Sequence, residues 1–200
     1  MPNVEEVVIA QYERIFVQRD WKLFKQIAEF HLKRAVFLRM SDLTEVPRQL
    51  RRLARNIDKR LRIGLGTELL LKAVYLKHGF SINLPKKKAA GTPPFPFSFQ
   101  QIQGIAQAAN RTYTLHPLIQ HLSSISAVGQ LGRDERGLRI AKVFRNKEGH
   151  AVFGKHAFDP TNYRDIEAAL TALYSKGFKQ SLQVRFSVKS GEKGLWRVRE

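Results

Sequence analysis

Residues 63–78, IGLGTELLLKAVYLKH, carry apolar side chains on nearly every side of a helix. A helix of this kind is normally buried by neighbours all around it. Gly79 follows directly and supplies the residue type that most often ends a helix. The stretch therefore predicts a central helix, and Tyr75 within it is expected to belong to the core of the protein.

Two amphipathic helices are predicted before this stretch, within residues 3–40. Their apolar residues recur at steps of three and four, the spacing of one helical face. The second is expected to start at Asp20, an N-cap residue type. We expect residues 1–43 to form a helical extension that packs on the rest of the chain. The apolar positions are Val4, Val7, Val8, Tyr12, Ile15 and Phe16 in the first helix, and Trp21, Phe24, Ile27, Ala28, His31 and Ala35 in the second.

A third helix is predicted to begin at Thr44, with Pro47 in its first turn. Its apolar stripe consists of Leu50, Leu53, Ile57 and Leu61. Cations at the same spacing share another face, about four turns long, along which a polyanion backbone can lie. For any single cation, a purely solvated position is the alternative. The predicted nucleic-acid contacts on this face are Arg48, Arg51, Arg52, Arg55, Lys59 and Arg62.

The proline-rich residues 80–98 predict a long exposed loop without regular structure,. Its basic run, Lys86, Lys87 and Lys88, is a further candidate for nucleic-acid contact. Helical patterns follow in residues 99–109 and 116–127 and again in residues 138–144, after a polar connection at residues 132–137,.

The C-terminal part predicts one more helix and then a β-hairpin. The helix starts near Asp159, carries an apolar face and stops at Gly177,. Alternating apolar residues on both sides of the turn SGEKG predict two paired strands in residues 179–200. The whole chain is therefore expected to be mainly α, a helical bundle with a small β appendage.

Composition narrows the chemistry. The formal net charge of +18 favours a polyanion, above all nucleic acid, as the partner,. With 0 cysteines, disulfides, thiolate nucleophiles and cysteine zinc sites are excluded,. The sequence contains no apolar run long enough to cross a membrane. Glu5 and Glu6 stand near the N-terminus, where a secretory signal would be basic, so we expect a cytoplasmic protein without membrane contact,.

Cofactor and metal sites find little support in the sequence. The carboxylates form no cluster beyond Asp134 and Glu135, and His116 and His121 have poor spacing for one helical face,. The GLG at residues 64–66 lacks the spacing and the lysine of a phosphate-binding loop. We therefore expect no metal and no cofactor.

The hexapeptide RNKEGH, residues 145–150, is the strongest candidate for a site. It places an arginine and a histidine five positions apart, with Asn146 directly behind the arginine. Arg111 and His116 repeat the spacing, but a threonine follows Arg111, and Pro117 disfavours a helical conformation at His116,. We therefore set the second pair aside.

These residue types suit RNA cleavage, in which the 2′-OH of the substrate attacks the adjacent phosphorus. His150 can transfer protons because imidazole titrates near neutral pH. Arg145 offers a planar fork of donors to the phosphate, and Asn146 can orient the substrate or the histidine. Lys147 is a candidate contact to the RNA backbone, whereas Glu148 is expected to be a solvated bystander.

The hexapeptide resembles the Arg-polar-x3-His motif of the HEPN superfamily, and the resemblance covers residues 44–177. It implies a HEPN-like antiparallel helical domain, residues 44–178, acting as a metal-independent endoribonuclease. It also implies a homodimer whose two motif copies form one composite site, in toxin-antitoxin or antiviral defence systems with an antitoxin or another regulatory protein as partner. Some HEPN toxins carry a tyrosine two residues after the histidine, where this chain has Val152.

Two other functions remain open at this point. The chain can be a non-catalytic, basic nucleic-acid-binding protein in which Arg145 and His150 make structural hydrogen bonds. Alternatively, it can be a helical scaffold whose net charge is incidental, for which weak RNA affinity at about 0.15 M salt would be expected.

Overall fold

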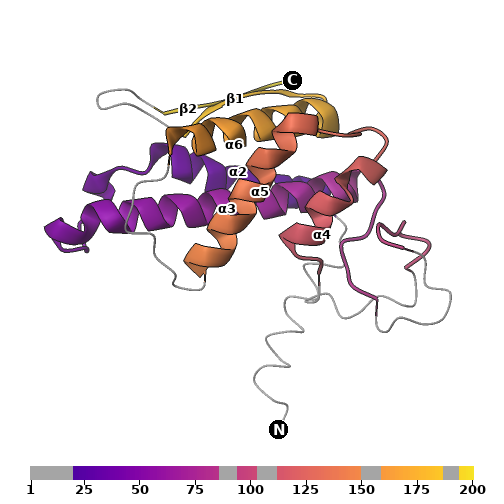
Figure 1. Cartoon of the computed structure of the whole chain (residues 1–200), viewed down its shortest axis with the longest axis horizontal. Helices are drawn as coiled ribbons and strands as arrows, with labels where there is room; N and C mark the ends of the chain where they lie inside the picture. Colours follow the sequence, from indigo (N-terminus) through magenta and orange to yellow (C-terminus); the bar gives the residue numbers. More distant parts are fainter. Residues whose placement is uncertain (1–19, 86–93, 103–111, 150–158, 187–193) are drawn as a thin grey trace, which may run out of the picture.

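The computed structural model describes residues 20–85, 94–102, 112–149, 159–186 and 194–200. Within these residues the chain is mainly helical and ends in a two-stranded antiparallel sheet. Figure 1 shows α3 along the length of the molecule, α5 crossing it, and α6 next to the sheet. The mainly α class and the C-terminal hairpin are confirmed. None of the described helices combines the length and the apolarity that crossing a membrane requires.

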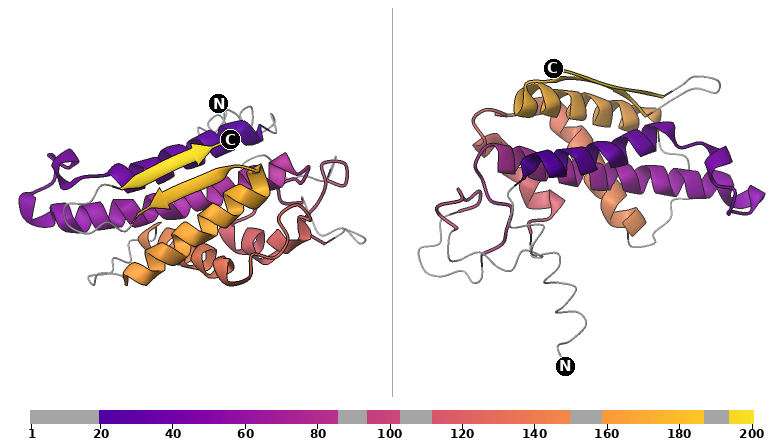
Figure 2. Two further views of the ribbon diagram at one scale, coloured as in Figure 1. Left: turned by 90° about the horizontal axis from the view of Figure 1, so that it is seen from above. Right: turned by 180° about the vertical axis from the view of Figure 1, so that it is seen from behind.

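Helix α2 (Trp21–Phe37) begins where its capping residue predicts. The Asp20 carboxylate accepts hydrogen bonds from the backbone N–H groups of Lys22 at 2.9 Å and Leu23 at 3.3 Å. The helix lies alongside α3 (Arg51–Lys77), as Figure 2 shows from two sides. The helix predicted before α2, in residues 3–17, lies outside the described residues.

The predicted start of α3 at Thr44 is wrong. The chain forms two short 3-10 turns, Met40–Asp42 and Arg48–Leu50, before α3 begins at Arg51. Pro47 caps the second turn in an extended conformation, which separates Thr44 from the helix. The predicted end is confirmed, because His78 caps α3 and Gly79 follows with φ of +84°.

The predicted orientation of the first half of α3 is wrong in part, since Ile57 and Leu61 of the apolar stripe are half-buried. Leu50 and Leu53, expected in the core, are 48% and 38% exposed. Lys59 and Arg60 are buried instead, together with Ile63. These two cations are buried because α5, α6 and Phe186 after β1 cover them, an arrangement that the local pattern does not contain.

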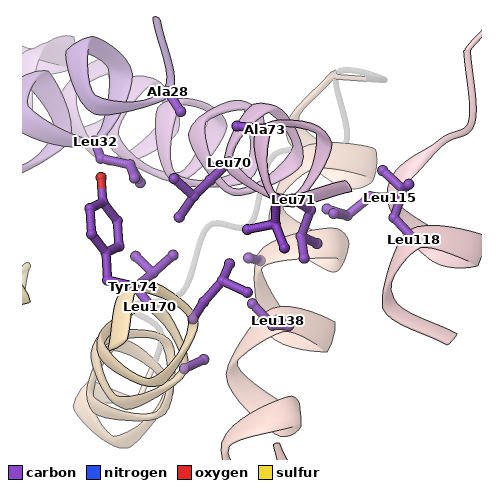
Figure 3. Packing of buried hydrophobic residues seen from close by; sticks show 14 of the residues in the cluster. Ala28, Leu32, Leu70, Leu71, Ala73, Leu115, Leu118, Leu138, Leu170 and Tyr174 are labelled. Atoms are coloured by element: carbon purple, nitrogen blue, oxygen red, sulfur yellow. The ribbon is translucent and has the colours of Figure 1, made fainter. Parts of the chain in front are cut away.

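The apolar half of α3 forms the centre of the core, as the sequence predicts. Leu70 and Leu71 are fully buried between α2 and the helices α4 (Leu115–Gln120), α5 (Glu135–Gly149) and α6 (Pro160–Leu173). Figure 3 shows these leucines surrounded by side chains of the neighbouring helices. Tyr75 is buried as expected, and its hydroxyl donates to the carbonyl of Leu118 at 2.9 Å.

Two segments before α5 differ from their predictions. The helix expected over residues 116–127 is short, since α4 is followed by a 3-10 turn at Leu122–Ser124. His116 is helical despite Pro117, because the proline occupies the first turn of α4, where its missing N–H group needs no partner,. The connection at residues 132–137 contains a 3-10 turn, Gly132–Asp134, and the start of α5.

The ends of the proline-rich loop are packed rather than exposed. Ile82 and Phe97 are buried, and Ser81 donates its backbone N–H to the carbonyl of Phe97 at 2.8 Å. The ring of Phe95 stacks on Tyr75 with 5.3 Å between centroids. The middle of the loop, with Lys86, Lys87 and Lys88, lies outside the described residues, as does most of the helix predicted at 99–109.

The C-terminal predictions are confirmed. The Asp159 carboxylate caps α6 by accepting from the backbone N–H of Thr161 at 2.8 Å, and a π-helical turn at Tyr174–Phe178 ends the helix. Strand β1 (Ser181–Arg185) pairs antiparallel with β2 (Leu195–Arg199). Leu182 and Trp196 are buried on one face of this hairpin.

Two glycines of α3 allow the helices around it to approach closely. A methyl group on Gly64 would lie 2.5 Å from Cβ of Arg145 on α5 and 2.6 Å from the backbone nitrogen of that residue. A methyl group on Gly66 would lie 2.6 Å from Cγ of Leu32 on α2. Residues two apart point to nearly opposite sides of a helix. The GLG sequence at 64–66 therefore serves two helix crossings.

Replacing Gly64 by alanine should destabilise the protein, although alanine favours a helix by about 1 kcal/mol over glycine. The added methyl group must separate α3 from α5, and overpacking of this kind costs about 1–3 kcal/mol or more. Urea unfolding of Gly64→Ala measures the balance. A stabilised variant would contradict the close crossing.

Candidate functional site at the end of α5

Helix α5 contains residues 145–149, five of the six residues of the hexapeptide. Leu138, Ala141 and Phe144 face the core, which fixes the rotation of the helix, and Asn146 and Lys147 are exposed. Arg145 is thus one turn before the helix end rather than at it, because α5 continues through Gly149. The predicted catalytic residue His150 lies outside the described residues.

Arg145 is anchored by a buried carboxylate on α3. Its Nε donates to Oε2 of Glu68 at 2.9 Å, with side chains 35% and 9% exposed respectively. The other oxygen of Glu68 accepts from Lys72 at 2.8 Å, and Lys72 also donates to the Thr112 hydroxyl at 3.0 Å. This chain of contacts orients the guanidinium and leaves part of it accessible to solvent.

Glu148 is not the solvated bystander that the sequence predicts. Its Oε1 accepts from Nε of Arg60 on α3 at 2.5 Å, and both side chains are only 2% exposed. A buried charge is tolerated when an opposite charge and hydrogen bonds compensate for its lost hydration. Glu148 therefore fixes the last turn of α5 against α3, next to the site.

Lys59 is likewise misassigned as a nucleic-acid contact. Its ammonium group donates to the backbone carbonyl of Phe186 and lies 4.9 Å from the ring centroid of Tyr163 on α6. Burial, and to a lesser extent the Arg55 charge, lower the pKa of Lys59 to about 8, against the opposing effect of Glu167. The side chain is part of the interior and is not available to a polyanion.

The rest of the predicted basic face is mixed. Arg48 and Arg52 are exposed, as expected, and Arg55 is half-buried. Arg51 donates to the backbone carbonyls of Val46 at 2.9 Å and Thr44 at 3.2 Å. Arg62 pairs with Asp58 at 2.6 Å. The structure therefore divides the predicted face between open cations and cations with internal partners.

A small pocket of about 230 Å³ lies between α4 and α5, lined by His116, Ile119, Gln120, Arg139 and Lys142. On α5, Arg139 and Lys142 precede Asn146 by seven and four positions, so the three residues share a helical face. Arg139 also pairs with Glu135 at 2.6 Å. His116, whose sequence context argued against a site, lies next to two cations on this face in the tertiary structure.

Sequence reasoning missed Glu68 and Arg60, the α3 partners of the site. Glu68 carried a usable signal, since it is an acid within an apolar stretch and precedes Lys72 by four residues, a favourable pair on a helix,. Arg60 carried none, because its partner is 88 positions away. Within the described ranges, no group of three or more histidines and carboxylates is arranged to hold a metal ion.

No protein-family model, no curated protein and no solved structure matches this chain.

Breaking the buried pair should cost far more stability than changing its exposed neighbour. Glu148→Ala leaves the buried Arg60 guanidinium without its paired carboxylate, so we expect a loss of about 3–5 kcal/mol in the free energy of unfolding. Lys147→Ala, the matched control, should change it by less than about 0.5 kcal/mol. Urea unfolding of the two variants measures the difference, and equal effects would show that Glu148 is not buried in solution.

The buried Lys59 should make stability depend on pH. Its pKa is about 8 in the folded chain and near 10.4 when unfolded. Between these values the unfolded chain binds more protons, so the free energy of unfolding should rise with pH by about 1 kcal/mol per unit. Lys59→Met should lack this contribution. Urea unfolding of the wild-type chain and of Lys59→Met between about pH 7.5 and 9.5 gives the difference in their free energies of unfolding, in which the contributions of other titrating groups cancel. If this difference does not change with pH, Lys59 is not buried as described.

Proposed function

We propose that the chain is a metal-independent endoribonuclease that uses Arg145, Asn146 and His150. The observation that carries the proposal is the state of Arg145, a partly exposed guanidinium held in place by Glu68 and followed by the exposed Asn146. A cation oriented before the substrate binds stabilises a phosphoryl charge without reorganisation during the reaction.

The chemistry divides among the three residues. Arg145 uses Nε for Glu68, and an arginine has further N–H donors, on its two Nη atoms, for a phosphate,. Asn146 offers an amide that can orient the ribose or the histidine. His150 transfers a proton during attack of the 2′-OH on phosphorus, a role that typically contributes about 10²–10⁴-fold.

The RNA backbone has a basic path along α5. Lys147 is exposed within the hexapeptide, and Arg139 and Lys142 line the pocket farther along the same helix. The formal net charge of +18 attracts polyanions over a longer range,.

The resemblance to HEPN proteins adds three elements to the proposal. These are a HEPN-like arrangement of residues 44–178, a homodimer that joins two motif copies at one site, and a role in toxin-antitoxin or defence systems. A dimer is chemically sensible because each protomer supplies only one arginine and one histidine of the motif. The biological role and any regulatory partner rest on the resemblance alone.

A non-catalytic nucleic-acid-binding protein is the second candidate. It is favoured by the ion pair of Arg145 with Glu68, since a structural pair of this kind also explains why an arginine stands at this position. A protein of this kind catalyses no reaction, so His150 has no catalytic role. The basic surface alone accounts for the binding of nucleic acid.

A cleavage assay with a fluorogenic single-stranded RNA in EDTA separates the two candidates. The full-length chain should cleave, and His150→Ala should lose at least about 100-fold in rate while its RNA affinity stays within about threefold. His121→Ala is the matched control, because His121 is a histidine outside both the hexapeptide and the pocket. It should retain most of the activity.

Three results would contradict the ribonuclease proposal. These are no cleavage by the wild-type chain, cleavage that EDTA abolishes, or full activity of His150→Ala. RNA binding without cleavage would support the second candidate, and weak RNA binding at about 0.15 M salt would favour a scaffold.

A further inference from the structure

Helix α2 presents large apolar side chains to solvent, which is unusual for a face without a partner. Phe30 is 62% exposed and Phe37 is 53% exposed, and Ile27 is also exposed. Phe30 and Phe37 are seven residues apart, so they lie on one face of the helix, about 10 Å apart along its axis. The opposite face of α2, with Ala28 and Leu32, is fully buried against α3.

Cations stand within this apolar face and not only at its edges. Lys33 and Arg34 are exposed, and at 100° per residue Arg34 falls between Ile27 and Phe30 around the helix. Among the described residues neither cation is in an ion pair. The outer face of α2 therefore alternates aromatic rings with positive charges.

The neighbouring turns continue the same composition. Met40, Leu50 and Leu53 are exposed apolar residues before and at the start of α3. The exposed cations Arg39, Arg48 and Arg52 lie among them, against the exposed acids Asp42 and Glu45. The Asp42 carboxylate already accepts a hydrogen bond from the backbone N–H of Arg39 at 2.9 Å. The surface from Ile27 to Leu53 thus carries a net positive charge.

The mixture of apolar rings and cations on this surface favours some classes of partner over others. A membrane or an apolar protein surface would bury Arg34 in the middle of the contact, at the cost of its hydration. Single-stranded nucleic acid offers flat apolar bases and anionic phosphates in alternation along one chain. Exposed aromatic rings with interleaved cations are the means by which single strands are bound without sequence readout.

We propose that the outer face of α2 binds single-stranded nucleic acid, with bases stacked on Phe30 and Phe37 and phosphates paired with Lys33 and Arg34. The choice of RNA as the strand rests on the proposed function. Because α2 and α5 pack against α3 through Gly66 and Gly64 on opposite sides of that helix, the surface is separate from Arg145. It anchors the strand and takes no part in the chemical step.

The test measures binding in a background that cannot cleave. Fluorescence anisotropy of a labelled 20-nucleotide single strand is followed with full-length His150→Ala, alone and combined with Phe30→Leu and Phe37→Leu. Leucine keeps an apolar side chain and removes the flat ring. Each leucine substitution should weaken binding about tenfold, the lower range for a lost stacked base. Tryptophan at the same positions should retain the affinity.

Two controls make the loss specific. A duplex of the same sequence should bind the leucine variants and the parent alike, because its bases are already stacked. Lys33→Gln combined with Arg34→Gln should lower the slope of log affinity against log salt by about 1.4, as expected for two phosphate contacts to a single strand. Thermal unfolding should be unchanged, since the rings are exposed.

Other outcomes would overturn the proposal. Unchanged single-strand binding of the leucine variants would exclude stacking. Tighter binding of the parent to vesicles of phosphatidylserine and phosphatidylcholine than to RNA would indicate a lipid surface. A lower unfolding temperature or a change in sedimentation of the leucine variants would indicate that this chain or a second copy covers the rings. Since binding is measured without turnover, failure of the ribonuclease proposal does not affect this result.

Discussion

The structure depends on how closely helices can approach α3. Gly64 lets α5 pack directly against the backbone of α3, and Gly66 does the same for α2. Any larger side chain at either position would prevent this close approach. Close crossing of α5 leaves the charged residues nearby with little access to water. They must therefore find partners across the crossing, because an isolated buried charge is strongly unfavourable. Arg60 with Glu148 and Arg145 with Glu68 are the result.

Because of such buried interactions, part of the positive charge of the chain is not available to a partner molecule. Lys59, Arg60 and Lys72 are buried, each with a partner inside the protein. They contribute to the formal net charge and to the packing of α3, and they do not contact a partner molecule directly. Among the described residues, the cations left for a polyanion are the exposed ones, which lie on the outer face of α2, at the start of α3, along α5 and α6 and on the C-terminal hairpin. Interaction with nucleic acid would therefore involve particular surfaces rather than the whole chain.

The proposed catalytic site and the proposed strand-binding surface lie on opposite sides of α3. On the α5 side, an arginine oriented by Glu68 suits a role in stabilising charge on a phosphate. On the α2 side, exposed rings and flexible cations suit the holding of a strand with little regard to its sequence. A catalytic arginine needs a rigid support, which Glu68 provides. A surface that only holds a strand needs exposed side chains, which the outer face of α2 provides.

The sequence by itself determined the elements with strong local signals. The apolar stretch 63–78, the cap at Asp20, the stop at Gly79 and the alternation of the hairpin each gave a correct prediction, since backbone propensity and periodicity act over a few residues. The helical pattern that leads into Arg145 and Asn146 is confirmed as well, although the helix continues for one turn beyond Arg145. Only the tertiary structure decided which side of α3 is buried, that Lys59 and Glu148 are interior, and that Phe30 and Phe37 are open. The physical reason is that burial depends on partners far along the chain, such as Phe186 for Lys59 and Arg60 for Glu148.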